Sequence, residues 1–263
     1  YDFQIVNHNL VLADILSQKG GRSRLLPPSG LMVFDEAHKL LDAARKMYGM
    51  VFCSTELEQV AASVCRAAVS STDKKEILHL RGEMLRLNTL LFETLKQEAG
   101  AKYDKTSQAV RFTPAVTRIL RALAVVLGRL SSCFQTAKRY TLLASRIDQK
   151  QEKLMVLLEH AQSICWLEHT GVTSCQVCAL PKELDYLLYE DIWNSDIPCV
   201  LTSATLSIGG DFSHFMHQTG IDLLEQNRLL MTSKASPFDY ENHALLYLPD
   251  CMPFPDTKNS VYM

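Results

Sequence analysis

The 263-residue sequence has no apolar run of the roughly 18–20 residues that a membrane-spanning helix needs, and no low-complexity segment. Glycine and proline, at 11 and 9 residues, are too sparse for a collagen-like or disordered chain. We expect no secretory signal sequence, and we therefore do not expect the eight cysteines to form the disulfide framework of a small secreted domain. We expect most of them to be buried in a reducing cytosol. Because the chain starts at Tyr1 rather than at a methionine, we expect a piece of a longer protein.

Acidic residues are missing from Lys105 to Ile147, although this segment carries eight lysines and arginines. The formal net charge of −2 therefore conceals an asymmetry. Residues 73–153 carry sixteen basic and eight acidic side chains, whereas residues 154–263 carry four and fourteen. Solvated helix surfaces usually mix both signs, so the basic block favours a polyanionic partner. The alternative is a basic face that balances the acidic C-terminal third.

The pattern of apolar residues predicts an α/β protein interrupted by a long helical stretch. Leu31 to Phe34 is a continuous apolar run, which is typical of a buried strand in a parallel sheet, and residues 198–202 have the same character. Between them, apolar residues recur at helical spacing over some hundred residues, with no strand signal. The expected helices cover residues 10–17, 55–70, 73–100, 133–160, 181–193 and 212–219, with one more after Pro114. The other expected strands are 3–7 and a hairpin of 164–168 with 172–180.

Asp35, Glu36, Ala37 and His38 follow the first apolar strand directly. A carboxylate pair at the carboxyl end of a parallel strand lies where α/β folds bind their ligands. In nucleotide hydrolases the first acid holds the Mg²⁺ that bridges the phosphates, and the next orients or deprotonates the attacking water. The alternative is structural: Asp35 caps the following helix and Glu36 stabilises its first turn.

Thr202, Ser203, Ala204 and Thr205 follow the second apolar strand in the same way. Small hydroxyl side chains at a strand end can hydrogen-bond an acidic motif and report the nucleotide state, although they can also cap a helix. The segment resembles the Ser-Ala-Thr motif of superfamily 2 helicases. Two such motifs, each after a buried strand, favour a nucleotide hydrolase over a pair of helix caps.

The spacing of the two motifs resembles the XPD and DinG branch of superfamily 2 DNA helicases. More than 160 residues separate them, mostly helical and basic, whereas the motifs are close neighbours in DEAH-box RNA helicases. Further local matches favour the bacterial DinG group. They are Ile5–His8 with Asp14, Leu26–Pro28, Trp166–Glu168, Phe212, Ser236–Tyr240, Leu248-Pro249 and Met252-Pro253.

The resemblance implies part of a RecA-like parallel-sheet motor domain, a large and mostly helical arch inserted into it, and the beginning of a second motor domain. The implied division is 1–45 for the first motor domain, 46–170 for the arch, 171–230 for the return to the first motor domain, and 231–263 for the second. It also implies an ATP-dependent DNA helicase, monomeric and cytoplasmic in bacteria, that couples ATP hydrolysis to translocation on single-stranded DNA and to duplex unwinding. Single-stranded and forked duplex DNA would be its partners, with no membrane involved.

Carried onto this sequence, the family motifs make Glu36 the catalytic base and Asp35 the ligand of the Mg²⁺ of Mg-ATP. His38 and residues 202–205 would couple the nucleotide site to the rest of the motor. No Gly-Lys-Ser or Gly-Lys-Thr phosphate loop occurs, so we expect the fragment alone not to hydrolyse ATP. Many relatives bind an iron–sulfur cluster through four upstream cysteines, and this fragment contains no such set. The alternative function is a catalytically inactive module that binds nucleic acid or protein. An RNA helicase fits the tetrapeptide but not the long insertion.

Arginines at helical spacing are the candidate DNA contacts. At about 100° per residue, Arg118, Arg121 and Arg129 share one face of the helix after Pro114, and apolar residues gather on another. Arg111 would join them only if the helix reached back past that proline. The alternative is a solvated face, which normally includes acids one turn away, and the acid-free segment offers none.

Cys175 and Cys178 have the spacing of a metal-binding pair, but no second pair matches them. They also lie in the expected hairpin. The sequence therefore favours ordinary packing or an adventitious disulfide over a metal site.

Overall fold

The structure, a computed structural model, describes residues 3–68, 73–99, 107–135, 138–170, 174–234 and 237–247. The chain divides into two compact units, residues 1–226 and 227–263. The first unit is mixed α/β, with a two-stranded parallel sheet and a four-stranded antiparallel sheet. In the second, the described residues form one short helix, α9 (Tyr240–His243). None of the helices in the described ranges is long and apolar enough to cross a membrane.

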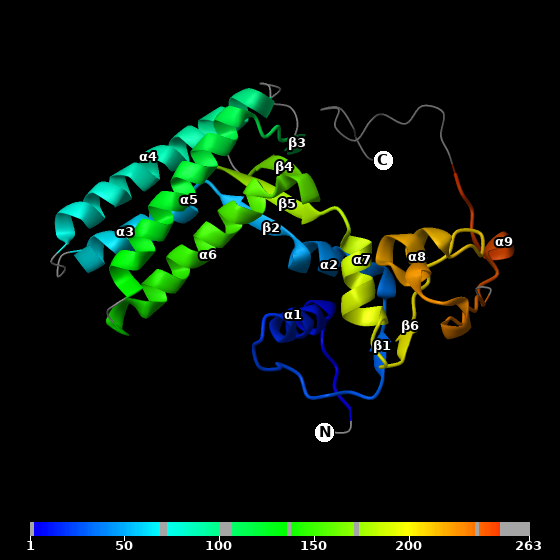
Figure 1. The fold of residues 1–263 in the computed structure, drawn as a ribbon. Coiled ribbons are helices and arrows are strands. Elements are labelled where there is room, and N and C mark those ends of the chain that lie inside the picture. Colours follow the sequence, from blue (N-terminus) through cyan, green and yellow to red (C-terminus); the bar gives the residue numbers. More distant parts are fainter. Residues whose placement is uncertain are drawn as a thin grey trace. The chain divides into compact units, whose positions relative to one another are not determined.

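The parallel sheet consists of β1 (Met32–Phe34) and β6 (Cys199–Leu201), which confirms both predicted apolar strands. Phe34 is paired with Leu201, so the two strands end at the same level. Figure 1 shows helices α1 (His8–Lys19), α2 (Leu40–Tyr48) and α7 (Leu184–Leu188) beside this sheet. A π-helical turn, Tyr189–Trp193, continues α7, and α8 (Ser213–Thr219) packs against α7.

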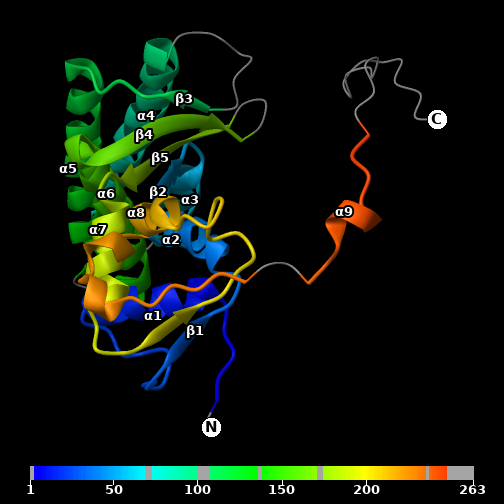
Figure 2. The same cartoon turned by 90° about the vertical axis from the view of Figure 1, so that its right-hand side faces the viewer.

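The four-stranded sheet has the order β2-β5-β4-β3, with β2 at Met50–Cys53, β5 at Cys175–Pro181, β4 at Ser163–His169 and β3 at Ser107–Ala109. Helices α3 (Glu56–Ala68), α4 (Lys74–Ala99), α5 (Pro114–Gln135) and α6 (Thr141–Leu158) accompany it. Figure 2 shows α4, α5 and α6 on one side of β4 and β5. Phe52, Leu167 and Val177 join the helices in one hydrophobic core and are fully buried.

The helices pack closely because their apolar residues recur at helical spacing. In α4, for example, Ile77, Leu80, Met84 and Leu91 are each fully buried. Gly128 allows α5 and α6 to approach, since an added Cβ there would lie 2.8 Å from Nε2 of Gln151.

Three expectations about secondary structure are wrong. Residues 3–7 form no strand; instead Asn7 caps α1, its Oδ1 accepting the N–H of Leu10 at 2.8 Å. The single helix expected over 133–160 is two, because α5 continues to Gln135 and α6 begins only at Thr141. The middle of the chain is not free of strands either, since it contains β2 and β3, whose three or four residues are too few to show a period. Among the local family matches, Ser236, Leu248-Pro249 and Met252-Pro253 lie outside the described residues.

Candidate functional site

The ends of β1 and β6 bring the two predicted motifs together. Oγ1 of Thr202 donates a hydrogen bond to Oδ1 of Asp35 at 2.8 Å. The backbone holds them in register: the N–H of Thr202 bonds the carbonyl of Phe34 at 2.9 Å, and the N–H of Ala37 bonds the carbonyl of Thr202 at 2.9 Å. Two side chains far apart in sequence therefore meet because their strands are parallel neighbours that end together.

The carboxylate of Asp35 is exposed, and its hydrogen bonds favour the ionised form. The hydrogen bond from Thr202 and then the bond from the N–H of Glu36, at 3.0 Å, hold the pKa of Asp35 below its ordinary value. Both bonds reach Oδ1, and no residue in the described ranges bonds Oδ2. No group of three or more His, Cys, Asp or Glu side chains that could enclose a metal occurs in those ranges. A single open carboxylate oxygen fits Mg²⁺, which is commonly held by one or two carboxylates together with phosphate oxygens and water.

Glu36, His38 and Ser203 form a second contact across the strand ends. Nδ1 of His38 lies 2.8 Å from Oγ of Ser203 and 3.2 Å from Oε2 of Glu36. The backbone of Glu36 has φ 48°, the only positive φ of a non-glycine residue in the described part of the chain. Such left-handed backbone is uncommon and clusters at functional sites. The hydroxyl of Ser203 also accepts the N–H of Thr205 at 3.3 Å, whereas Ala204 contributes no polar side chain.

An aromatic cluster that the sequence did not predict as part of the site supports this strand end. The Phe34 ring is close to both His8, at 5.9 Å between ring centroids, and Trp193, at 5.8 Å and edge-on. The π-helical turn presents Trp193, whose Nε1 donates to the carbonyl of Thr219 at 2.7 Å. Histidine spacing gave no signal for His8. Only the family match over Ile5–His8 pointed to it.

The arginine face of α5 exists as predicted, but one of its members is already paired. Arg118, Arg121 and Arg129 are all exposed on α5. Nη2 of Arg129 lies 2.9 Å from Oε1 of Glu76, which belongs to α4. The sequence prediction missed this ion pair because it considered only acids on the same helix. Arg111 does not belong to the arginine face, because α5 begins at Pro114.

Cys175 and Cys178 do not form a metal site. Residues three apart in a strand point to opposite faces of the sheet, so the two sulfurs cannot bind one ion. Cys175 belongs to the core beneath the helices, while Cys178 does not, and both are free thiols. Burial and the neighbouring Glu168 raise the pKa of Cys178 to about 12, so this thiol stays neutral. Of the two interpretations that the sequence favoured, ordinary packing therefore fits these free thiols and a disulfide does not.

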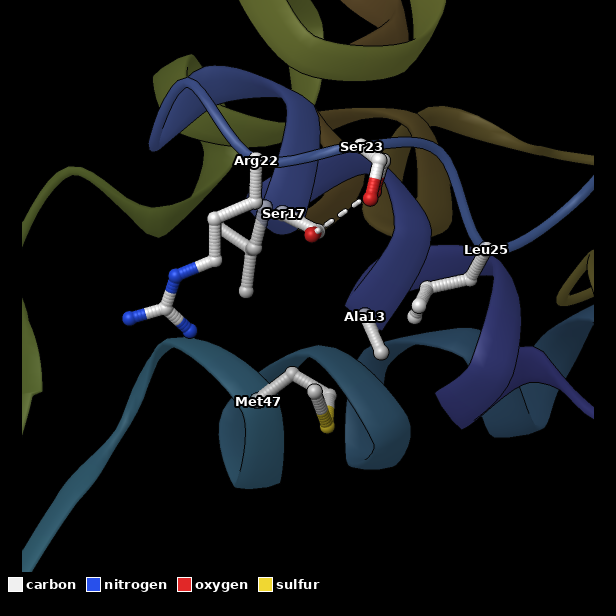
Figure 3. Close-up of a pocket in the computed structure, with 7 residues that line it drawn as sticks. Ala13, Ser17, Arg22, Ser23, Leu25 and Met47 are labelled. Carbon is white, nitrogen blue, oxygen red and sulfur yellow. Dashed lines mark hydrogen bonds between the residues drawn. The ribbon is translucent and has the colours of Figure 1, made fainter. Parts of the chain in front are cut away.

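A pocket of about 480 Å³ lies between α1, α2 and the loop that follows α1, away from both motifs (Figure 3). Oδ1 of Asp14 holds this loop by accepting the N–H groups of Leu25 and Leu26. The pocket is mainly apolar, with Arg22 at its edge and the hydroxyl of Ser17 bonded to the carbonyl of Ser23. Its lining residues are Ala13, Leu16, Ser17, Arg22, Ser23, Leu25 and Met47, and none of them is a predicted site residue.

Comparison with known proteins supports the family resemblance. No protein-family model matches the chain. It is, however, 26% identical over 93% of its length to the ATP-dependent DNA helicase YoaA of Escherichia coli (strain K12), and 24% identical over 99% to YoaA of Haemophilus influenzae. It is also 24% identical over 94% of its length to the ATP-dependent DNA helicase DinG of Photobacterium profundum. The chain spans only 38%, 40% and 41% of these three relatives, respectively.

Proposed function

We propose, from its similarity to ATP-dependent DNA helicases, that this chain is the central part of a DinG-like helicase that couples ATP hydrolysis to translocation on single-stranded DNA and to duplex unwinding. The observation that carries the proposal is the hydrogen bond between Thr202 and Asp35, supported by the contact of His38 with Ser203. Residues that only cap their own helices would not need to hydrogen-bond each other across the ends of two parallel strands. A nucleotide site that must report its state to the rest of a motor requires such a link.

In this proposal each residue at the strand end has a separate task. Asp35 is the Mg²⁺ ligand, and Thr202 with the N–H of Glu36 keeps it ionised and fixes its orientation. Glu36 is the base that accepts a proton from the attacking water. Mg²⁺, when bound, neutralises charge that develops on the phosphates. His38 and Ser203, with Thr205 bonded to Ser203, couple Glu36 to the strand end that carries residues 202–205.

We also propose that α3 to α6 and the four-stranded sheet form the inserted arch, between the parts of the first motor domain. A boundary at residues 170 and 171 would cut the hairpin of β4 and β5, which are paired along their whole length. We therefore place the return to the motor domain after Pro181. Residues from about 231 onwards, in the second compact unit, would begin the second motor domain.

The arginines of α5 are the proposed contact with single-stranded DNA, and forked duplex DNA would be the substrate of the whole enzyme. We propose a monomeric, cytoplasmic bacterial protein. Without a phosphate loop, the 263-residue chain would lack a cradle for the β- and γ-phosphates and would not hydrolyse ATP alone. An iron–sulfur cluster in the whole protein would take its ligands from outside this chain.

The experiment uses the full-length parent protein and measures ATP binding and DNA-stimulated ATP hydrolysis separately. Glu36→Gln should abolish turnover and leave ATP affinity nearly unchanged, because only the base is lost. Thr202→Val, which keeps the side-chain shape but removes the hydroxyl, should lower turnover less severely. Ser207→Ala, a few residues beyond the motif, is the control for the loop.

A parent protein that binds single-stranded DNA but shows no ATP hydrolysis in its unaltered form would instead support the catalytically inactive binding module. Turnover that survives Glu36→Gln would remove the proposed base.

A further inference from the structure

One face of the four-stranded sheet is left partly open by the helices of the described ranges. Side chains alternate between the faces of a strand. On the helix side, Phe52 and Leu167 are fully buried. On the other side, the adjacent Val51 is 42% exposed and Ile164 is 55% exposed. In Figure 2, helices α4 to α6 lie on only one side of β4 and β5.

Trp166 lies on this open face and its indole is held in place. Nε1 of Trp166 donates a hydrogen bond to Oε1 of Glu168, and Nε2 of Gln176 donates to Oε2 at 2.8 Å. These two bonds hold the pKa of Glu168 below its ordinary value. Because the only N–H of the indole is already used, its remaining means of binding a ligand is the ring face.

Two cations lie at one end of the same face. Val110 and Phe112 pack against the core, whereas Arg111 between them is exposed. Arg111 follows Ala109, whose strand partner is Trp166. Lys182 is exposed just after β5, with its Nζ bonded to the carbonyl of Ala161 at 2.8 Å. Glu168 is the only acid among the residues of the four strands, and its two oxygens already accept bonds.

We propose that this open face, defined by Trp166, Arg111 and Lys182, is a second binding surface for single-stranded DNA, separate from the arginines of α5. A base stacks on Trp166, and Arg111 and Lys182, toward the start of β4, contact phosphates on one side of that base. Aromatic side chains beside a basic track are the usual means of binding single strands without sequence preference. The inference rests on the proposed DNA-binding function. A purely apolar protein partner fits less well, because it would bury two cations without an opposite charge.

Tryptophan emission of the 263-residue chain tests this directly. The chain has two tryptophans, and Trp193 is only 4% exposed, so an exposed-face ligand acts on Trp166. Adding an oligo(dT) of about 16 nucleotides should quench the emission. Trp166→Phe should abolish the quenching while an end-labelled oligonucleotide still binds with nearly unchanged affinity. Trp166→Ala should weaken binding roughly tenfold or more. Trp193→Phe is the matched control and should keep the quenching.

Arg111→Gln provides a variant that keeps the indole and its hydrogen bond to Glu168. It should weaken binding and lower the slope of log affinity against log salt by roughly 0.7. If oligo(dT) binds but neither the emission of Trp166 nor the affinity of Arg111→Gln changes, the open face does not bind DNA and the inference is wrong. If Arg118→Gln/Arg121→Gln nevertheless loses affinity for oligo(dT), DNA binds through α5 and the proposed function is still supported. If the unaltered chain binds no single-stranded DNA, both the inference and the proposed DNA contact of α5 fail.

Discussion

The ion pair between Arg129 and Glu76 predicts that the three arginines of α5 contribute unequally to DNA binding. Arg118 and Arg121 are exposed, and neither forms an ion pair within the described ranges, whereas Arg129 shares its charge with Glu76. Each phosphate contact contributes roughly 0.7 to the salt slope for single strands. Arg118→Gln/Arg121→Gln should therefore lower the slope by about 1.4. Between roughly 50 and 200 mM salt, the unaltered chain should lose about sevenfold more affinity than this variant. Arg129→Gln should lower the slope by less than about 0.7.

Glu76→Gln should have the opposite effect. Removing the carboxylate frees Arg129 for a phosphate, so both affinity and slope should rise, the slope by up to about 0.7. The fold should be nearly unaffected, since both partners are more than half exposed and such surface pairs contribute only about 0.2–1 kcal/mol.

The assay is fluorescence anisotropy of end-labelled oligo(dT), measured over a series of salt concentrations, with thermal unfolding as the check on folding. Arg24→Gln/Arg66→Gln is the matched control, because it removes the same charge from exposed positions, in the loop after α1 and on α3, that form no ion pair within the described ranges. An equal loss of slope in this control would mean that only net charge matters. An unchanged slope in a folded Arg118→Gln/Arg121→Gln variant would refute the contact itself, and an unchanged affinity of Glu76→Gln would refute the argument about pairing.

Two further predictions concern stability. Gly220 ends α8 with φ 73°, and an added Cβ would lie 2.0 Å from the carbonyl oxygen of Asp185, so Gly220→Ala should cost about 2–4 kcal/mol in thermal or urea unfolding. Gly82→Ala, in the open on α4, should instead stabilise by about 0.5–1 kcal/mol, and similar effects at the two sites would contradict the geometry. Burial disfavours the charge of Glu56, but bonds from Lys150, Lys153 and the N–H of Cys53 outweigh it and hold its pKa below the ordinary value. Its ionisation therefore stabilises the fold above the ordinary carboxyl pKa of about 4.3, and this contribution is lost as the pH falls through the lower pKa of the folded state. Glu56→Gln should cost about 1–3 kcal/mol at neutral pH and progressively less in acid, whereas the control Glu58→Gln, at an exposed position of the same helix, should cost much less at neutral pH.

The sequence predicted those features that depend on neighbours along the chain. Strands β1 and β6 are continuous apolar runs, and α4 follows a helical period over 26 residues, so both were found. The two candidate motifs were recognisable because each directly follows such a strand. Contacts between elements distant in sequence could not be predicted from such patterns. Glu76 on α4 forms an ion pair with Arg129 on α5, and a π-helical turn places Trp193 against Phe34. The opposite faces of Cys175 and Cys178 follow from strand alternation, which a spacing rule for metal ligands ignores.

The pairing of β2 with β5 has a mechanical consequence. Met50 is the strand partner of Ala179, so the chain passes into the four-stranded sheet after Gly49 and leaves it after Pro181 through two adjacent strands, about 5 Å apart. At Gly49 an added Cβ would lie 2.3 Å from the carbonyl oxygen of Arg45, so the backbone is tightly confined at this joint. If α3 to α6 and this sheet form the proposed arch, the arch is a lever attached at this joint. Helix α4, with 26 residues, is about 39 Å long. A rotation of the arch by about 10° about this joint would move a point about 39 Å away by about 7 Å, the length of roughly two base steps of duplex DNA.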